Sequence, residues 1–173
     1  AACGSLGWLC MEWIRHGKPS VLVIVTGMVA GLGTITPASG SVGPAGAVVI
    51  GLSAGVVCYF ATITLKNRLG IDDSLDVFPV HGVGGMLGLF MAGIFCSPSL
   101  GLFSGNGFSD GVEGISGQLA IQLCAIGATF IYTAVISWVL LRIVNALVSL
   151  RVDQEDETAG LDIVLHDERG YDL

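Results

Sequence analysis

The stretch "DVFPVHGVGGMLG", residues 76–88, places one histidine, His81, inside an apolar and glycine-rich segment. An imidazole donates and accepts hydrogen bonds and changes its charge near neutral pH. In a membrane span such a group is costly unless it is hydrogen-bonded, and it tends to mark the path of an ion or substrate. His81 is therefore the first candidate for a functional residue. The alternative is a structural histidine that is hydrogen-bonded to a backbone carbonyl.

Helical spacing predicts what lies beside this histidine. On a helix that begins near Asp76, His81 shares a face with four small residues, which are Gly84, Gly85, Gly88 and Ala92. Either the backbone of another helix fills such a stripe or the stripe borders a narrow passage. Asp76 is placed to cap the helix, and Pro79 falls in its first turn, where the missing N–H costs little.

The rest of the sequence contains no set of residues with catalytic or metal-ligand spacing. The other two histidines, His16 and His166, lie outside the apolar segments, and the five cysteines form no C-x-x-C pair. No paired carboxylates, Ser-His-Asp arrangement or phosphate-binding loop is present. We therefore predict that the protein is not an enzyme and has no cofactor, metal or nucleic-acid partner.

Composition shows which kind of protein positions these residues. The mean hydropathy is +0.80, with 53% hydrophobic and only 12% charged residues, far outside the range of a soluble domain. Residues 151–173 contain eight of the 14 acidic residues and two of the seven basic ones. The low isoelectric point is thus a property of a polar tail, and the remainder of the chain is nearly neutral.

Apolar runs predict an all-α, polytopic membrane helix bundle over residues 1–150, followed by the tail. A helix needs about 20 apolar residues to cross hydrocarbon. The expected helices, the first of them cut short, cover about 1–14, 20–39, 44–65, 77–96 and 118–149. Two small-xxx-small pairs, Gly27 with Gly31 and Gly51 with Gly55, predict close packing between helices.

Basic residues predict the orientation of the bundle. They occur in the first and third connections and at the exit of the last helix, at Arg15, Lys18, Lys66, Arg68, Arg142 and Arg151. The second and fourth connections have none. Because cytoplasmic loops are enriched in Lys and Arg, the tail is expected in the cytoplasm. An apolar cluster around residues 161–165 suggests that this tail docks onto another surface.

Several separated motifs resemble one family. "LGIDDSLDVFPVHGVGGMLG", "TPASGSVGPAGAVVIG", "EWIRHGKPS" and "GLDIVLHDERGY" are similar to the C-terminal half of an ammonium transporter of the Amt/MEP/Rh family, of the bacterial Amt type. The resemblance covers essentially the whole chain. It implies the last five helices of an eleven-helix transporter fold, a homotrimer, and a bacterial plasma (inner) membrane location with a cytoplasmic C-terminus.

The resemblance also implies a role for individual residues. His81 corresponds to the second of two pore histidines that hydrogen-bond to each other and line a narrow hydrophobic conduit for ammonium or ammonia. Val77 and Thr26 would line the lower pore, and Asp73 and Asp76 would lie near its cytoplasmic end. The first pore histidine, an aromatic gate and an outer ammonium-recruiting site belong to earlier helices of the family, which this sequence does not contain.

The tail matches a family motif at four positions, Gly160, Asp162, His166 and Tyr171. In the family this motif packs under neighbouring subunits, and a PII-type signalling protein blocks the cytoplasmic pore mouth of bacterial relatives. Two residues depart from the pattern, because Pro79 and Asp167 stand where glycine is usual. Two alternatives remain, an ammonium sensor that signals through this tail and an unrelated transporter with a coincidental histidine.

Overall fold

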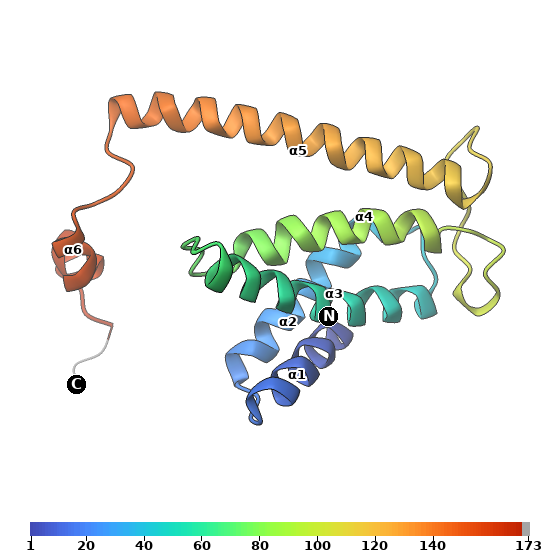
Figure 1. Cartoon of the computed structure of the whole chain (residues 1–173), viewed down its shortest axis with the longest axis horizontal. Helices are drawn as coiled ribbons and strands as arrows, with labels where there is room; N and C mark the ends of the chain where they lie inside the picture. Colours follow the sequence, from blue (N-terminus) through green and yellow to red (C-terminus); the bar gives the residue numbers. More distant parts are fainter. Residues whose placement is uncertain (171–173) are drawn as a thin grey trace. The chain divides into compact units, whose positions relative to one another are not determined.

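The computed structural model describes residues 1–170, and every regular element within them is a helix. The all-α class predicted from the sequence is confirmed. The chain divides into two compact units, residues 1–127 and the part from Ala128 onward, which are described separately. Figure 1 shows the order of the helices along the chain.

Unit 1 contains four helices and the beginning of a fifth. They are α1 (Ala2–His16), α2 (Val21–Ile35), α3 (Pro44–Ile63), α4 (Gly84–Phe95) and α5 (Gly114–Leu147). Four helical segments of the described residues are long and apolar enough to cross a membrane, namely Val21–Ala38, Pro44–Arg68, Phe78–Phe95 and Gly114–Leu147. These segments follow the order of the last four helices expected from the sequence, and α1 occupies the place of the shortened first one.

Local sequence explains where the first helices end and begin. Gly17 adopts a left-handed conformation with φ 71° and terminates α1. Ser20 then caps α2 by accepting a hydrogen bond from the Val23 N–H. Pro37 lies in a short 3₁₀ turn, η1 (Thr36–Ala38), directly after α2, so the helix ends where this proline was expected to break it.

Glycines let α1 pack closely against both α2 and α3. A Cβ atom at Gly4 would overlap the carbonyl oxygen of Gly27 and lie 2.8 Å from the Cα of Gly31. On the other side, a Cβ at Gly51 would lie 2.9 Å from the Cβ of Cys3. Both predicted glycine pairs therefore lie at helix contacts, as expected where lipid offers no hydrophobic drive for helices to associate.

Trp8 of α1 anchors the buried cluster between these helices. Its side chain is 3% exposed and packs with Ala30, Cys58, Tyr59 and Val80. The Trp8 and Tyr59 rings meet edge to face, with centroids 5.9 Å apart, a favourable arrangement for two aromatic quadrupoles. Val80 belongs to this cluster, and the segment that carries His81 packs against α2 and α3.

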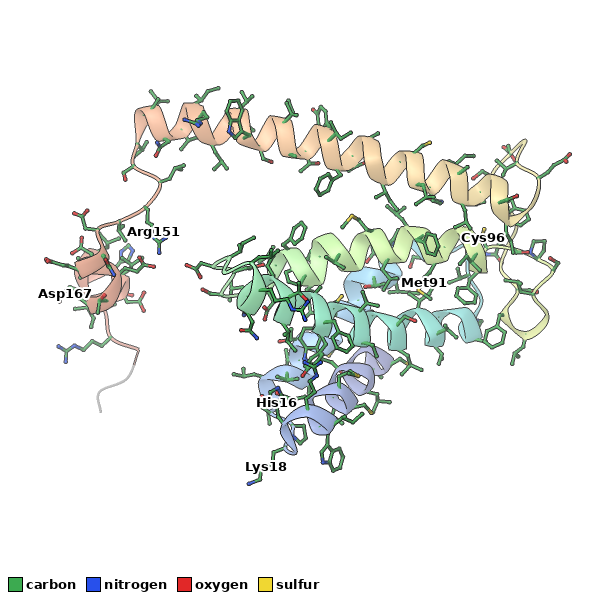
Figure 2. All side chains as sticks on the ribbon, viewed as in Figure 1. His16, Lys18, Met91, Cys96, Arg151 and Asp167 are labelled. Atoms are coloured by element: carbon green, nitrogen blue, oxygen red, sulfur yellow. The ribbon has the colours of Figure 1, made fainter. Side chains whose placement is uncertain are left out.

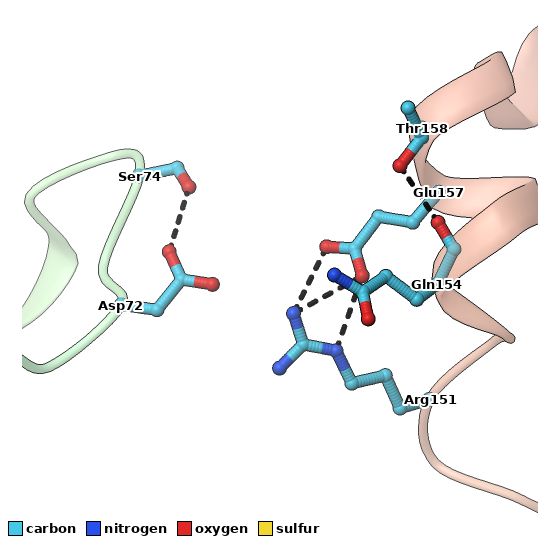
Figure 3. A network of polar contacts seen from close by, with 6 residues as sticks. All are labelled: Asp72, Ser74, Arg151, Gln154, Glu157 and Thr158. Atoms are coloured by element: carbon cyan, nitrogen blue, oxygen red, sulfur yellow. Dashed lines mark hydrogen bonds and ion pairs between the residues drawn. The ribbon is translucent and has the colours of Figure 1, made fainter.

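Unit 2 contains the rest of α5 and two short helices, α6 (Gln154–Ala159) and α7 (Leu161–His166). The Arg151 guanidinium pairs with the Glu157 carboxylate at 3.0 Å, and the Thr158 hydroxyl donates to the Gln154 carbonyl oxygen (Figure 3). These contacts stabilise the start of α6.

The glycine contacts make a quantitative prediction for Gly55. A Cβ atom there would overlap the Gly4 carbonyl oxygen and lie 2.6 Å from the Trp8 nitrogen. Gly55→Ala is therefore expected to lower the free energy of unfolding by about 1–3 kcal/mol, because two backbones must separate. Thermal unfolding in detergent measures the change. Gly127→Ala is the control, since nothing lies within 4 Å of its added Cβ, and an equal loss in both variants would contradict the packing argument.

Candidate functional site

Two π-helical turns flank the loop that precedes His81. The first, η2 (Thr64–Arg68), extends α3, and the second, η3 (Phe78–Val83), leads into α4. In η2 the Leu69 N–H donates to the carbonyl of Thr64, five residues earlier, at 3.1 Å. Hydrogen bonds of this i→i+5 type are rare and occur frequently at functional sites.

The His81 side chain is exposed on the surface of unit 1. A Cβ atom at Gly33 of α2 would lie 3.6 Å from its Nδ1, so α2 approaches the ring without covering it. Within the described residues the imidazole makes no hydrogen bond. The alternative of a structural histidine bonded to a backbone carbonyl is therefore not supported, and both ring nitrogens are free to bind another group.

The stripe of small residues that we expected beside His81 divides into two faces. Gly84, Gly88 and Ala92 are buried, and a Cβ at Gly88 would overlap the Thr34 carbonyl oxygen of α2. Gly85, in contrast, has open space around it. His81, whose side chain is exposed, lies in the π turn directly before these glycines.

His81 faces a groove of about 550 Å³ on unit 1. The groove is lined by residues from η2, the following loop and η3, which are Leu65, Ile71, Asp72, Asp73, Val77, Phe78, His81 and Gly82. It brings together three of the predicted site residues, Asp73, Val77 and His81. Apolar side chains surround the imidazole, and the two carboxylates come from the loop.

Thr26 does not line the groove. Its hydroxyl donates to the Leu22 carbonyl oxygen of its own helix at 3.1 Å. Thr26 lies seven residues before Gly33, which corresponds to two helical turns, so the two residues share a face of α2. Because Gly33 is the point where α2 approaches His81, Thr26 lies on the same side of α2 as the imidazole.

Asp73 and Asp76 make different contacts at the start of η3. We expected Asp76 to be the cap, but the side chain that accepts the first N–H groups belongs to Asp73, whose carboxylate oxygens lie 2.9 Å from the nitrogens of Val77 and Phe78. Asp76 instead pairs with the Lys66 ammonium of η2 at 2.8 Å. Ser74 donates to Asp72 within the loop (Figure 3).

The predicted tail residues lie around α7. Gly160 has φ 98° and separates α6 from α7, Asp162 lies in the first turn of α7, and His166 is its last residue. Tyr171 lies outside the described residues. Asp167 has a left-handed backbone with φ 51°, and the next N–H, of Glu168, donates to the Asp162 carbonyl. The conformation at Asp167 is one that glycine adopts most easily, which agrees with the glycine that the family resemblance leads us to expect there.

Comparison with known proteins assigns the chain to a family. The model of the Ammonium Transporter Family matches residues 1–171. The chain belongs to the ammonium transporter family. An ammonium transporter of Bacillus subtilis (strain 168) is 37% identical over 99% of this chain, and a protein named as a putative ammonium transporter of Methanothermobacter thermautotrophicus is 42% identical over all of it. The chain spans 42% of the length of each of these two relatives.

Solved structures of ammonium transporters share the fold. Mep2 of Saccharomyces cerevisiae matches 89% of this chain with a TM-score of 0.75 and 36% identity, and the chain covers 35% of it. A structure titled "Sensor Amt Protein" matches 95% of the chain with a TM-score of 0.80 and 27% identity, and the chain covers 39% of it. With its four apolar helices, this member of the ammonium transporter family is an integral membrane protein.

Sequence reasoning about this ammonium transporter family member missed five of the eight groove residues, which are Leu65, Ile71, Asp72, Phe78 and Gly82. Phe78 follows Val77 directly, and its ring lies 3.0 Å from the position of a Cβ at Gly82, so a side chain there would require the ring to shift slightly. Leu65 comes from the end of α3, and no local pattern links it to His81. The pairing of a glycine with the aromatic residue four positions earlier is the one signal that the sequence offered for Phe78.

The cap at Asp73 predicts a loss of stability that is local to the groove. Asp73→Ala removes the acceptors of two N–H groups and is expected to cost about 1–2 kcal/mol. Hydrogen exchange of the amides of Val77, Phe78 and Val80 measures the opening of this turn. Ser74→Ala, which removes only an exposed hydroxyl contact, is expected to change the same amides little. Equal exchange in the two variants would argue against the cap.

The left-handed residues of the tail predict changes of opposite sign. Asp167→Gly is expected to stabilise the end of α7 by about 0.5–1 kcal/mol, because glycine carries no Cβ in this conformation. Gly160→Ala, at φ 98°, is expected to destabilise the same segment by at least about 1 kcal/mol. Hydrogen exchange of residues 161–168 in the full-length protein reads out both. Faster exchange in Asp167→Gly would show that the aspartate side chain itself stabilises the turn.

Proposed function

We propose that this chain takes part in moving ammonium or ammonia across a membrane and that His81 lines the path. The observation that carries the proposal is the exposed imidazole, without a hydrogen bond in the described residues, at the edge of an apolar groove. An ionisable side chain within a membrane span requires a hydrogen-bonding partner. A permeating molecule or a second imidazole can be that partner. Membership of the ammonium transporter family supports the choice of substrate.

The chemistry of the groove suits a small neutral molecule that forms hydrogen bonds. Val77 and Phe78 offer apolar surface, which disfavours an ion that has lost its water shell. His81 can donate to or accept from ammonia as it passes. We propose that Val77 and Thr26 line the lower part of this path and that Asp73 and Asp76 lie near its cytoplasmic end. A second pore histidine would come from outside this chain.

We also propose a location and an assembly. The alternation of basic and uncharged connections supports a cytoplasmic tail, and the family resemblance supports a bacterial plasma (inner) membrane location. By family resemblance the working unit is a homotrimer, and the tail residues Gly160, Asp162, His166 and Tyr171 contact neighbouring subunits. A PII-type signalling protein is the proposed partner at the cytoplasmic pore mouth.

A sensor function is the second candidate. The likeness to the structure titled "Sensor Amt Protein", with its TM-score of 0.80, favours it. The two functions differ in what the tail does. If residues 151–173 are removed, a sensor loses its signal to cytoplasmic partners while ammonium uptake continues. A transporter whose subunits are coupled by the tail loses uptake itself. Growth on low ammonium, measured together with uptake, separates these outcomes.

Replacement of His81 tests the leading proposal. His81→Ala in the full-length protein is expected to reduce ammonium uptake about tenfold or to admit other cations, because a hydrogen bond of about 1–1.5 kcal/mol to the permeating molecule is lost. Ammonium-evoked current in proteoliposomes, with potassium as the competing ion, measures both. His16→Ala is the matched control, since His16 lies at the end of α1. Wild-type current and selectivity in His81→Ala would refute the assignment.

A further inference from the structure

The loop of residues 69–77 determines how the two sides of the groove are placed. It joins the π turns η2 and η3, and the groove takes Leu65 from the first and Phe78 and His81 from the second. Any change in the conformation of this loop therefore moves one wall of the groove against the other. The contacts that hold the loop therefore also affect the geometry of the groove.

The loop turns into the helix at Asp76, in an unfavourable backbone conformation. Asp76 has φ 56°, the left-handed region that a residue with a Cβ atom rarely adopts. Its N–H donates to the Asp73 carbonyl at 3.2 Å, and its own carbonyl accepts from the Val80 N–H at 3.0 Å. The conformation is thus required for the turn on one side and for the helix on the other.

One ion pair acts on this residue from across the loop. The Lys66 Nζ lies 2.8 Å from the Asp76 Oδ1, and the two side chains are 37% and 17% exposed. Oδ1 is inaccessible to solvent and has no partner with hydrogen-bond geometry within the described residues, so Lys66 supplies the charge that offsets its burial. A pair that is partly withdrawn from water attracts more strongly than one on an open surface.

We propose that Lys66 is a positioning residue for conduction. Its pair with Asp76 stabilises the left-handed turn and so holds Val77 and Phe78, the two residues that follow, in place against η2. Lys66 does not line the groove, and Asp73 is the residue that caps Val77 and Phe78. The Lys66–Asp76 pair therefore acts neither by lining the groove nor by capping the helix. The conduction part of this inference rests on the function proposed above; the structural part does not.

Two single variants separate positioning from electrostatic attraction of ammonium. Lys66→Met leaves an extra negative charge beside the groove, and Asp76→Asn leaves an extra positive one. If the pair positions the groove, both variants lower the maximal uptake rate, by about fivefold for the loss of a partly buried pair, and leave the half-saturating concentration unchanged. If the charges attract the substrate, the half-saturating concentration shifts in opposite directions in the two variants, and the proposal is overturned.

A rescue variant tests the link to the backbone. Glycine adopts positive φ without a side-chain clash, so Lys66→Met combined with Asp76→Gly is expected to recover most of the uptake that Lys66→Met alone loses. Arg68→Met, in the same π turn, is the control and is expected to behave as wild type. Failure of the glycine to rescue would overturn the idea that the pair acts by stabilising the left-handed turn.

Hydrogen exchange separates this inference from the proposed function. In the full-length protein Lys66→Met is expected to raise the exchange rates of the amides of residues 76–78 and of Val80 about fivefold, whether or not the protein conducts. Unchanged exchange would overturn the inference even if transport were intact. Faster exchange with normal uptake would overturn the positioning role. A wild-type protein that conducts no ammonium would refute the proposed function, while faster exchange would still support the pair's structural role.

Discussion

The groove depends on the change in helical register at Phe78–Val83. A regular α-helix would place His81 in line with Gly84 and Gly88, which are packed against α2. In the structure His81 lies in a π turn, a rare type of turn that is frequent at functional sites, and its side chain is exposed. One segment therefore contacts the bundle through its glycines and also presents an exposed imidazole.

The close packing behind the π turn makes this rotation possible. Val80 belongs to the buried cluster around Trp8, and Trp8 itself lies on the helix that contacts α2 and α3 through glycines. The glycines bring the backbones together, the cluster fixes Val80, and Val80 fixes the orientation of its neighbour His81. Contacts on the opposite side of the same helices thus hold the wall of the groove in place.

The sequence predicted the features that depend on local composition. Hydropathy located the apolar helices, and the glycine pairs Gly27–Gly31 and Gly51–Gly55 marked real contacts. The register at His81 was missed because a π turn differs from an α turn by one hydrogen-bond step, which hydrophobic periodicity does not resolve. The exchange of roles between Asp73 and Asp76 was missed for another reason. Both aspartates stand just before the helix, and Asp76 pairs with Lys66, ten residues earlier, a contact that exists only once the loop has closed.

The two ends of the α3–α4 pair are held by different kinds of contact. At one end the loop of residues 97–113 is fixed by backbone hydrogen bonds, from Gly105 to Ser97 at 2.8 Å and from Asn106 to Ser41 at 3.0 Å, and a Cβ at Gly105 would overlap neighbouring carbonyl oxygens. At the other end the loop of residues 69–77 is held by carboxylates, at Asp73 and Asp76. Backbone contacts of this kind respond little to salt, whereas salt screens the attraction between ionised groups such as Lys66 and Asp76. Sensitivity to ionic strength is thus greater at the end where the groove opens beside His81.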